Sequence, residues 1–173
     1  MHELHLLRHA KARAKSDLGD HERTLSRRGR EAARRIGEHL PAAVGVLDLA
    51  LSSSAARTRE TLDLVLAGFA VRPRLLIEDE LYLADRDRLI ARLRRVDEAA
   101  TSVLLVGHNP ALYELAIALA DPVSPRAAAL AAGKLPTGAR ASFRIDAPWS
   151  ALGLSPHRLA DYATPDSLPD EKG

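Results

Sequence analysis

The sequence lacks cysteine entirely and has few aromatic residues. Without a cysteine among its 173 residues, the chain can form no disulfide, no thiolate nucleophile and no zinc site with sulfur ligands. Only 3% of the residues are aromatic, which leaves little surface on which nucleic-acid bases would stack. The charges nearly cancel, because 25 Lys and Arg face 23 Asp and Glu. We therefore expect no nucleic-acid partner.

Long hydrophobic runs are missing as well. No stretch approaches the roughly 20 apolar residues that span a membrane, and the first residues lead into a short apolar run rather than a secretory leader. These absences favour a cytoplasmic protein with no membrane contact. The 46% of hydrophobic residues suffice for a single domain over residues 1–173, with a tail at 164–173 that we expect to fray. The oligomeric state is left open.

Short apolar runs alternate with helical periodicities along most of the chain. The strand-like runs are 4–7, 47–52, 74–77, 103–106, 141–145 and 158–162, and the direction of the last two is ambiguous. Strands that alternate with helices predict a three-layer α/β/α sandwich with a mostly parallel central sheet. The unbroken VLLV at 103–106 predicts a strand that is buried on both faces.

Polar residues and prolines suggest where the helices begin and end. Ser26 is a good cap for a helix that we expect to end near Pro41. Ser53 or Ser54 is expected to cap the helix after the second strand, and Asn109 the helix after VLLV. A short helix is expected at 127–132. We expect Tyr82 to be a packing residue, with a pocket wall as the alternative, and His21 to be a solvated or structural residue.

Arginines and histidines stand where the predicted strands end. Arg8 and His9 close the first strand, where such residues are costly to bury without partners. Arg57 lies one turn beyond the second strand, and His108 follows VLLV within two residues. Ligands of parallel sheets bind outside the carboxyl ends of the strands, so we expect these four side chains to converge. Guanidinium groups and helix N-termini together predict a site for a phosphoryl group.

The residue types that accompany these arginines and histidines restrict the chemistry of the site. No carboxylate trio or cysteine accompanies it, so we expect neither a metal ion nor another cofactor. A histidine can itself attack phosphorus and form a phosphoramidate that water later hydrolyses. Neighbouring cations would lower the pKa of such a histidine from about 6.5 and keep its ring neutral.

Three segments resemble, in the same order, the motifs of the histidine phosphatase superfamily. They are Arg-His-Ala at 8–10, SSAARTRET at 53–61 and GHNP at 107–110. Within this superfamily, the pieces DHERTLSRRG, ELYLAD and VGHNP are most similar to the SixA-type phosphohistidine phosphatases. The resemblance covers roughly residues 3 to 145 of the chain.

The resemblance implies the α/β fold already expected and a two-step phosphoryl transfer with His9 as nucleophile. The residues that it implies around the transferred phosphoryl group are Arg8, Arg57 and His108, with Ser53 to help position the anion and Arg23 at the border of the pocket.

Two residues depart from the pattern of the superfamily. Ala10 replaces a glycine, which matters only if the backbone there has a positive φ or makes a very close approach. Many members also carry an acidic proton donor after the third strand, where this chain has Leu83, and Glu80 is a weak candidate for that role. An alkoxide leaving group benefits from such an acid, whereas an imidazole protonated on its other nitrogen needs less help. The substitution therefore favours a P–N substrate.

We accordingly expect a metal-independent phosphohistidine phosphatase that acts on phosphorylated protein histidines through a covalent intermediate. The alternatives are a phosphatase for small phosphate esters, a mutase, and a noncatalytic module that binds phosphate or nucleic acid in the same crevice. Substrate choice is expected to depend on the loops 11–21 and 121–136, and the sequence names neither the target protein nor the pathway.

Overall fold

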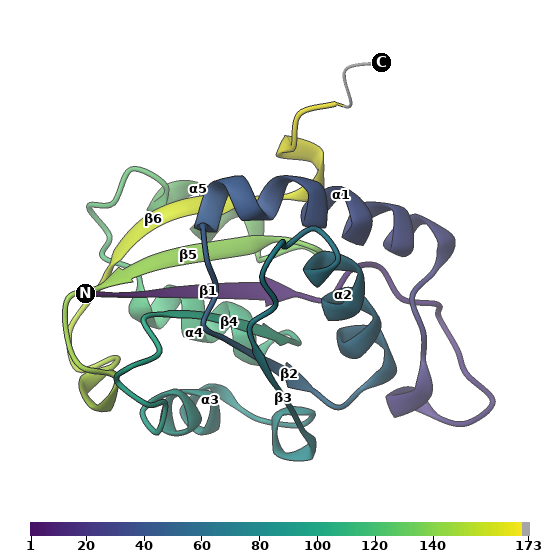
Figure 1. Ribbon diagram of the computed structural model, residues 1–173, viewed down its shortest axis with the longest axis horizontal. Helices are drawn as coiled ribbons and strands as arrows, with labels where there is room; N and C mark the ends of the chain where they lie inside the picture. The colour runs from purple at the N-terminus through teal and green to yellow at the C-terminus, as the bar shows by residue number, and fades with distance from the viewer. Residues whose placement is uncertain (171–173) are drawn as a thin grey trace.

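The structure is a computed structural model that describes residues 1–170. In these residues six strands form one sheet in the order β3-β2-β4-β1-β5-β6 (Figure 1). The strands are β1 (His2–Arg8), β2 (Leu49–Ser53), β3 (Arg74–Glu78), β4 (Ser102–Gly107), β5 (Arg140–Ile145) and β6 (Arg158–Ala163). Strand β5 runs antiparallel to both of its neighbours, and the other pairs are parallel. The predicted mostly parallel sheet is confirmed.

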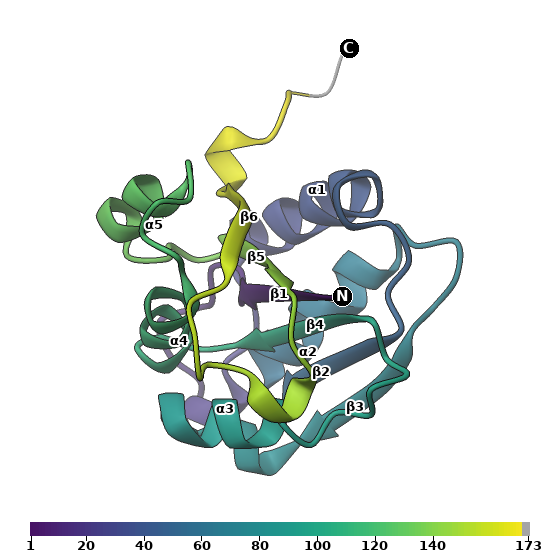
Figure 2. The same ribbon diagram turned by 90° about the vertical axis from the view of Figure 1, so that its left-hand side faces the viewer.

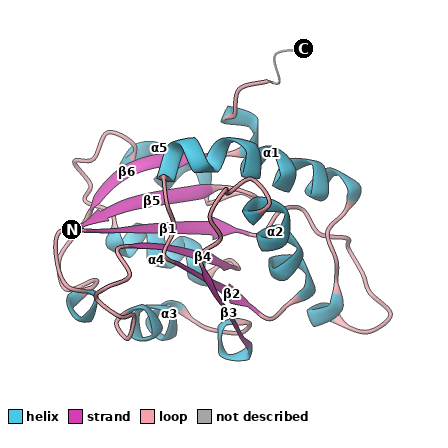
Figure 3. Ribbon diagram, in the orientation of Figure 1, coloured by secondary structure: helices cyan, strands magenta, loops and turns pink. Residues whose placement is uncertain are grey.

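Helices cover both faces of the sheet (Figure 3). They are α1 (Arg27–Val44), α2 (Ala56–Leu66), α3 (Arg86–Leu93), α4 (Ala111–Leu119) and α5 (Ala127–Gly133). Figure 2, a view along the sheet, separates α1 and α2 on one face from α3, α4 and α5 on the other. Each face has its own apolar cluster, built on Ile36, Leu40 and Leu62 on one side and on Leu89, Leu112 and Leu115 on the other. The three predicted layers are confirmed.

Strand β4 lies at the centre of the parallel part of the sheet. It pairs with β1 on one side and β2 on the other, and every one of its residues is buried. This agrees with the unbroken apolar run in its sequence. No helix among residues 1–170 combines the length and the apolar character that crossing a bilayer demands.

Helix α1 begins as predicted but ends later. The Ser26 hydroxyl accepts a hydrogen bond from the backbone N–H of Gly29, whereas the expected end at Pro41 is wrong. The helix continues to Val44 because Leu40 and Val44 lie on the face that is buried against the sheet. It ends at Gly45, whose φ of 68° suits glycine best.

The two other predicted caps are also wrong. Ala55 is the N-cap of α2, and the Ser53 hydroxyl instead accepts from the N–H of Ala55 while Ser53 still belongs to β2. Pro110 is the N-cap of α4, because the side-chain amide of Asn109 donates to the carbonyls of Lys134 and Leu135.

The end of the described chain is more ordered than the predicted fraying tail. Residues Pro165–Ser167 form a 3-10 helix that begins with a capping box at Thr164. Leu168 packs against the cluster under α1, and the Arg35 guanidinium donates to the carbonyls of Leu168 and Pro169. Apolar contact and helix capping thus hold this segment. Residues 171–173 of the predicted tail lie outside the described residues.

Candidate active site

The carboxyl ends of β1, β2 and β4 bring the four predicted side chains to one edge of the sheet. Arg8 ends β1, Arg57 lies in the first turn of α2 and His108 directly follows β4. The backbone N–H of His9 donates to the carbonyl of Gly107 at 3.2 Å, which joins the ends of β1 and β4. The ring centroids of His9 and His108 lie 5.4 Å apart.

The ring of His9 is buried and held in one tautomer. Its Nδ1 lies 2.7 Å from the carbonyl oxygen of Ala10, and a carbonyl only accepts, so Nδ1 carries the hydrogen. The lone pair is therefore on Nε2. Burial, aided by the cations Arg57 and Arg8 and opposed by the Ala10 hydrogen bond, lowers the pKa of His9 to about 4. The ring is neutral at physiological pH.

Ala10 accommodates its backbone without the glycine of the resembling motif. The described residues other than glycine that have a positive φ are Lys134 and Leu135, so Ala10 is not among them. Its N–H donates to the Thr61 hydroxyl, which in turn donates to the carbonyl of Arg57. Thr61 thus ties the loop after β1 to α2.

Two arginines face the same buried edge. Burial lowers the pKa of Arg8, and the charge of Arg57 lowers it further, which places the two guanidinium groups within electrostatic reach of each other. Arg8 Nη1 donates to the carbonyl of Leu135 at 3.3 Å. Arg57 has only 6% of its surface exposed, and its two Nη atoms donate to Asp20.

His108 is anchored by Ser53. Its Nε2 lies 2.7 Å from the hydroxyl of Ser53, the serine that the sequence predicted to help position the anion. Burial lowers the pKa of His108 to about 3, and the charge of Arg57 adds to this effect. A bound anion would oppose both influences, because negative charge favours the protonated ring.

Unpartnered polar atoms gather in this cluster. In the described part of the chain, five buried side-chain nitrogen or oxygen atoms have no hydrogen-bond partner. They are Arg8 Nε, Arg57 Nε, His108 Nδ1, Asn109 Oδ1 and the hydroxyl of Tyr162. Buried polar groups are normally paired, and those that are not concentrate at functional sites. Three of these atoms belong to the four predicted residues, which marks this edge as the candidate site.

Sequence reasoning missed Asp20, and for Tyr82 the alternative of a pocket wall agrees better with the structure than packing does. Asp20 begins the 3-10 helix η1 (Asp20–Glu22), and its carboxylate accepts from Arg57 Nη2, from Arg23 Nε and from the hydroxyl of Tyr82. The Tyr82 ring contacts those of His108 and His21 edge-on, at centroid distances of 5.7 and 4.7 Å. Arg23 contacts the cluster through Asp20.

The protonation states of this group are well defined. The Tyr82 hydrogen bond, together with Arg23 and Arg57, lowers the pKa of Asp20 to about 2, so the carboxylate stays ionised. The same hydrogen bond raises the pKa of Tyr82, which keeps its hydroxyl protonated. The signal in the sequence was the position of Asp20 three residues before Arg23, within the segment DHERTLSRRG.

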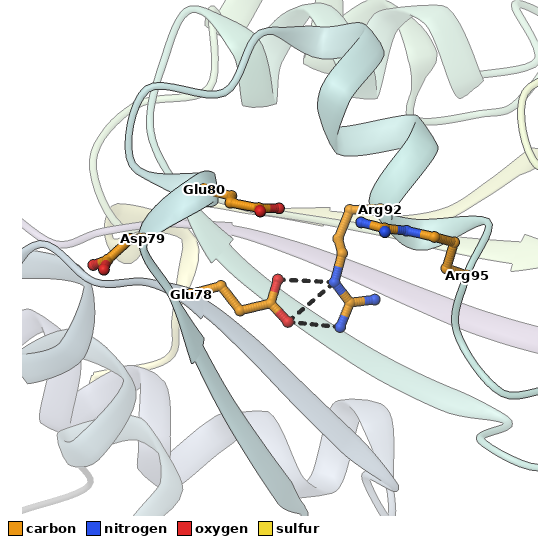
Figure 4. A pocket seen from close by; sticks show the side chains of 5 residues that line it. All are labelled: Glu78, Asp79, Glu80, Arg92 and Arg95. Carbon is orange, nitrogen blue, oxygen red and sulfur yellow. Dashed lines mark hydrogen bonds and ion pairs between the residues drawn. The ribbon is translucent and has the colours of Figure 1, made fainter.

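Glu80 lies in a different hollow. Together with Glu78, Asp79, Arg92 and Arg95 it lines a surface pocket of about 520 Å³ beside the 3-10 helix η2 (Asp79–Leu81) (Figure 4). Glu78 and Arg92 form a salt bridge there, with Arg92 Nη2 2.7 Å from Glu78 Oε1. The side chain of Glu80 points into this pocket. In the 3-10 turn it is Tyr82, rather than Glu80, that reaches His108.

Comparison with known families gives a consistent result. A model of the histidine phosphatase superfamily (branch 1) matches residues 4–82, which include Arg8, His9 and Arg57. An uncharacterised protein of Mycobacterium tuberculosis is 34% identical over 162 residues, covering 92% of this chain and 99% of its own.

Solved structures agree with this family. A candidate phosphohistidine phosphatase, SixA of Nakamurella multipartitia, is 30% identical with a TM-score of 0.81, covering 95% of this chain and 96% of its own. The corresponding structure from Agrobacterium tumefaciens is 27% identical with a TM-score of 0.77, covering 94% and 97%. A protein histidine phosphatase SixA complexed with tungstate has a TM-score of 0.78 at 22% identity, covering 96% and 99%, and shows the same fold.

Proposed function

This chain belongs to the histidine phosphatase superfamily, and from that premise we propose that it is a metal-independent phosphohistidine phosphatase that acts on protein histidines. One observation carries the proposal. The hydrogen bond from His9 Nδ1 to the Ala10 carbonyl directs a neutral lone pair on Nε2 into a cluster of cationic side chains. A neutral imidazole with a fixed tautomer is a competent nucleophile toward phosphorus.

In the first step the Nε2 lone pair of His9 attacks phosphorus, and the bond between phosphorus and the leaving group breaks. The His9 ring then carries a positive charge, because Nδ1 keeps its hydrogen and Nε2 is bonded to phosphorus. The Ala10 carbonyl stabilises this cation through the hydrogen bond at Nδ1. Arg8, Arg57 and His108 bind the phosphoryl oxygens, where charge builds up in the transition state.

In the second step a water molecule attacks phosphorus and the His9–phosphorus bond breaks. Its electron pair returns to Nε2, so His9 leaves as a neutral imidazole and the water proton departs with phosphate or solvent. A neutral imidazole needs no proton donor to leave. The enzyme is then ready for another turnover.

Neither of the two acidic candidates supplies a proton to the leaving group of the first step. Asp20, the carboxylate bonded to Arg57, has a pKa of about 2 and holds no proton to give at neutral pH. Glu80 points into another pocket. Such a site suits a substrate imidazole better than an alkoxide. The SixA names of the two structural relatives above 25% identity support the same substrate class.

A labelling experiment tests the proposal. The protein is mixed with a radioactive phosphohistidine protein, quenched within milliseconds, and digested to locate the label. We expect an acid-labile label on His9 that His9→Ala does not acquire. Steady-state rates on the phosphohistidine protein should also exceed those on a panel of sugar phosphates. Label on another residue, or esters as the better substrates by orders of magnitude, would refute the proposal. A noncatalytic module would be indicated if the unsubstituted protein showed no turnover and His9→Ala left its phosphate binding unchanged.

A further inference from the structure

Asp20 lies at the rim of the site, whereas the nucleophile lies at its floor. The side chain of Asp20 is 55% exposed, and His9 is 7% exposed. Contacts connect the two residues, because the His9 ring lies 5.4 Å from that of His108, which lies 5.7 Å from the Tyr82 ring, and the Tyr82 hydroxyl donates to Asp20. The site therefore runs outward from His9 past these two side chains to Asp20.

The hydrogen bonds of the Asp20 carboxylate leave one position open. An ionised carboxylate has about four lone-pair sites on its two oxygens. Oδ2 accepts from Arg57 and from the Tyr82 hydroxyl, and Oδ1 accepts from Arg23 Nε at 2.9 Å. One acceptor site thus remains on Oδ1 of a side chain that is 55% exposed.

The hydrogen bonds of Arg57 leave room for a phosphoryl group. A guanidinium carries five N–H donors, and Arg57 gives one to the carbonyl and one to the carboxylate of Asp20. Three donors remain, including the unpartnered Nε. Asp20 therefore fixes the orientation of Arg57 without consuming its capacity to bind an anion.

The geometry of displacement directs the leaving group to this rim. The attacking and leaving atoms lie roughly in line across phosphorus. Because His9 attacks from the floor, the leaving group points outward, toward the Tyr82 ring and Asp20. A histidine on the surface of another protein would have to enter and leave from this side.

We propose that Asp20 is a specificity-determining residue whose Oδ1 accepts a hydrogen bond from the free ring N–H of a substrate phosphohistidine and keeps that ring protonated. The inference rests on the proposed function. When the His9–phosphorus bond forms, the substrate P–N bond breaks and its electron pair stays on the ring nitrogen. The protonated ring thereby becomes a neutral imidazole, and no proton has to be supplied. A developing alkoxide would instead face the negative charge of Asp20.

The pH dependence of kcat separates this role from a purely structural one. A nearby carboxylate raises the pKa of a bound imidazole, by about 1 unit or more at hydrogen-bond distance. On a phosphohistidine substrate, Asp20→Asn should move the alkaline limb of the kcat profile down by about 1 pH unit. Its kcat should therefore fall about tenfold more at alkaline pH than at pH 6. With p-nitrophenyl phosphate, which has no ring nitrogen, the limb should stay in place.

Two further variants complete the experiment. Asp63→Asn removes an exposed carboxylate from α2, outside the loops expected to govern substrate choice, and its profile should match that of the unsubstituted protein. Asp20→Ser is measured alongside, so that the limb can be read if the asparagine variant folds poorly. A loss that is equal at every pH and on both substrates would assign Asp20 only to the positioning of Arg57 and overturn the inference. An unchanged profile would overturn it as well.

The outcomes also separate this inference from the proposed function. If the unsubstituted protein hydrolyses phosphohistidine but the limb does not move in the Asp20 variants, the inference alone fails. If the unsubstituted protein hydrolyses only esters, the proposed function fails and the inference falls with it.

Discussion

The pKa of His9 is set by burial, by a carbonyl and by neighbouring cations, so a single arginine should change it measurably. Arg57 is the cation with the largest effect on His9. Arg57→Gln should raise the pKa of His9, because a positive charge that disfavours the protonated ring is removed. An NMR titration of the histidine rings would measure this. Arg59→Gln, an exposed neighbour on α2, should leave the His9 titration in place. A pKa that stays or falls in the Arg57 variant would contradict the assignment.

Arg57 should contribute more to kcat than to binding of the substrate in its ground state. A preorganised donor at an oxyanion contributes roughly a hundredfold to kcat, or about 3 kcal/mol. We expect Arg57→Gln to lower kcat by about that factor. Stopped-flow measurement of the first turnover tests it, and a change confined to KM would show that Arg57 contributes only to ground-state binding.

Ser53 and Ser52 are adjacent serines that should behave differently. Ser53 holds His108 at 2.7 Å, whereas the Ser52 hydroxyl donates to the carbonyl of Ser53. Ser53→Ala leaves Nε2 of His108 without its partner, and kcat/KM should fall about tenfold, as expected for one lost hydrogen bond. Ser52→Ala should preserve kcat/KM. Equal losses in the two variants would mean that the effect comes from strand β2 rather than from His108.

At the scale of single residues, the sequence predicted the positions of side chains that stand at or just after the ends of strands. Arg8, His9 and His108 each stand where a buried strand stops, and Arg57 lies one turn into the next helix. Asp20 was missed because its partners Arg57 and Tyr82 are 37 and 62 positions away. No periodic pattern connects residues across loops, so that contact depends on a loop conformation that only the structure provides.

At the scale of elements, the local capping rule succeeded at Ser26 and failed at Ser53 and Asn109. The Ser26 hydroxyl donates to the carbonyl of Lys11 and still accepts from the N–H of Gly29, so it caps α1 as expected. The Ser53 hydroxyl instead contacts His108, and the side-chain amide of Asn109 donates to two carbonyls just after α5. Pro41 is retained inside α1 because the burial of Val44 outweighs its helix-breaking tendency. Tertiary packing thus overrode the local signal at each failure.

The crossing of α1 and α2 gives a prediction about stability. A Cβ added at Gly68, in the turn after α2, would lie 1.8 Å from the carbonyl oxygen of Gly37 in α1, so this turn approaches α1 too closely for a side chain. Gly68→Ala should lower the free energy of unfolding by about 1–3 kcal/mol through overpacking. Urea denaturation measures this. Gly107→Ala, whose nearest contact would be a Leu112 methyl group at 3.6 Å, should cost less. The reverse order would refute the close-approach argument.

At the scale of the whole molecule, buried histidines couple stability to pH. Burial lowers the pKa of His5 and His9 to about 4 and that of His108 to about 3, from 6.5. Between pH 6.5 and 4 the unfolded chain therefore binds more protons than the folded one, so stability rises with pH. We expect the free energy of unfolding to fall as the pH decreases through this window. Guanidinium denaturation at pH 7, 5.5 and 4.5 tests it, and a constant value would contradict it.

Alternating apolar runs sufficed to predict the layers and the parallel sheet, since each run had to be buried between helices. They left the direction of β5 and β6 open because either direction buries Phe143 and Leu159 equally well. The order at the carboxyl end was likewise missed, since TPDSLP has no apolar periodicity and depends on the pocket that receives Leu168.

Strand β1 also separates the beginning of the chain from the site. Met1 is 77% exposed and precedes the amino end of β1, and the seven residues of this strand place it about 20 Å from Arg8 at the carboxyl end (Figure 1). A bead, a surface or a fluorescent reporter attached through the amino terminus would therefore leave the mouth of the site turned toward the solution.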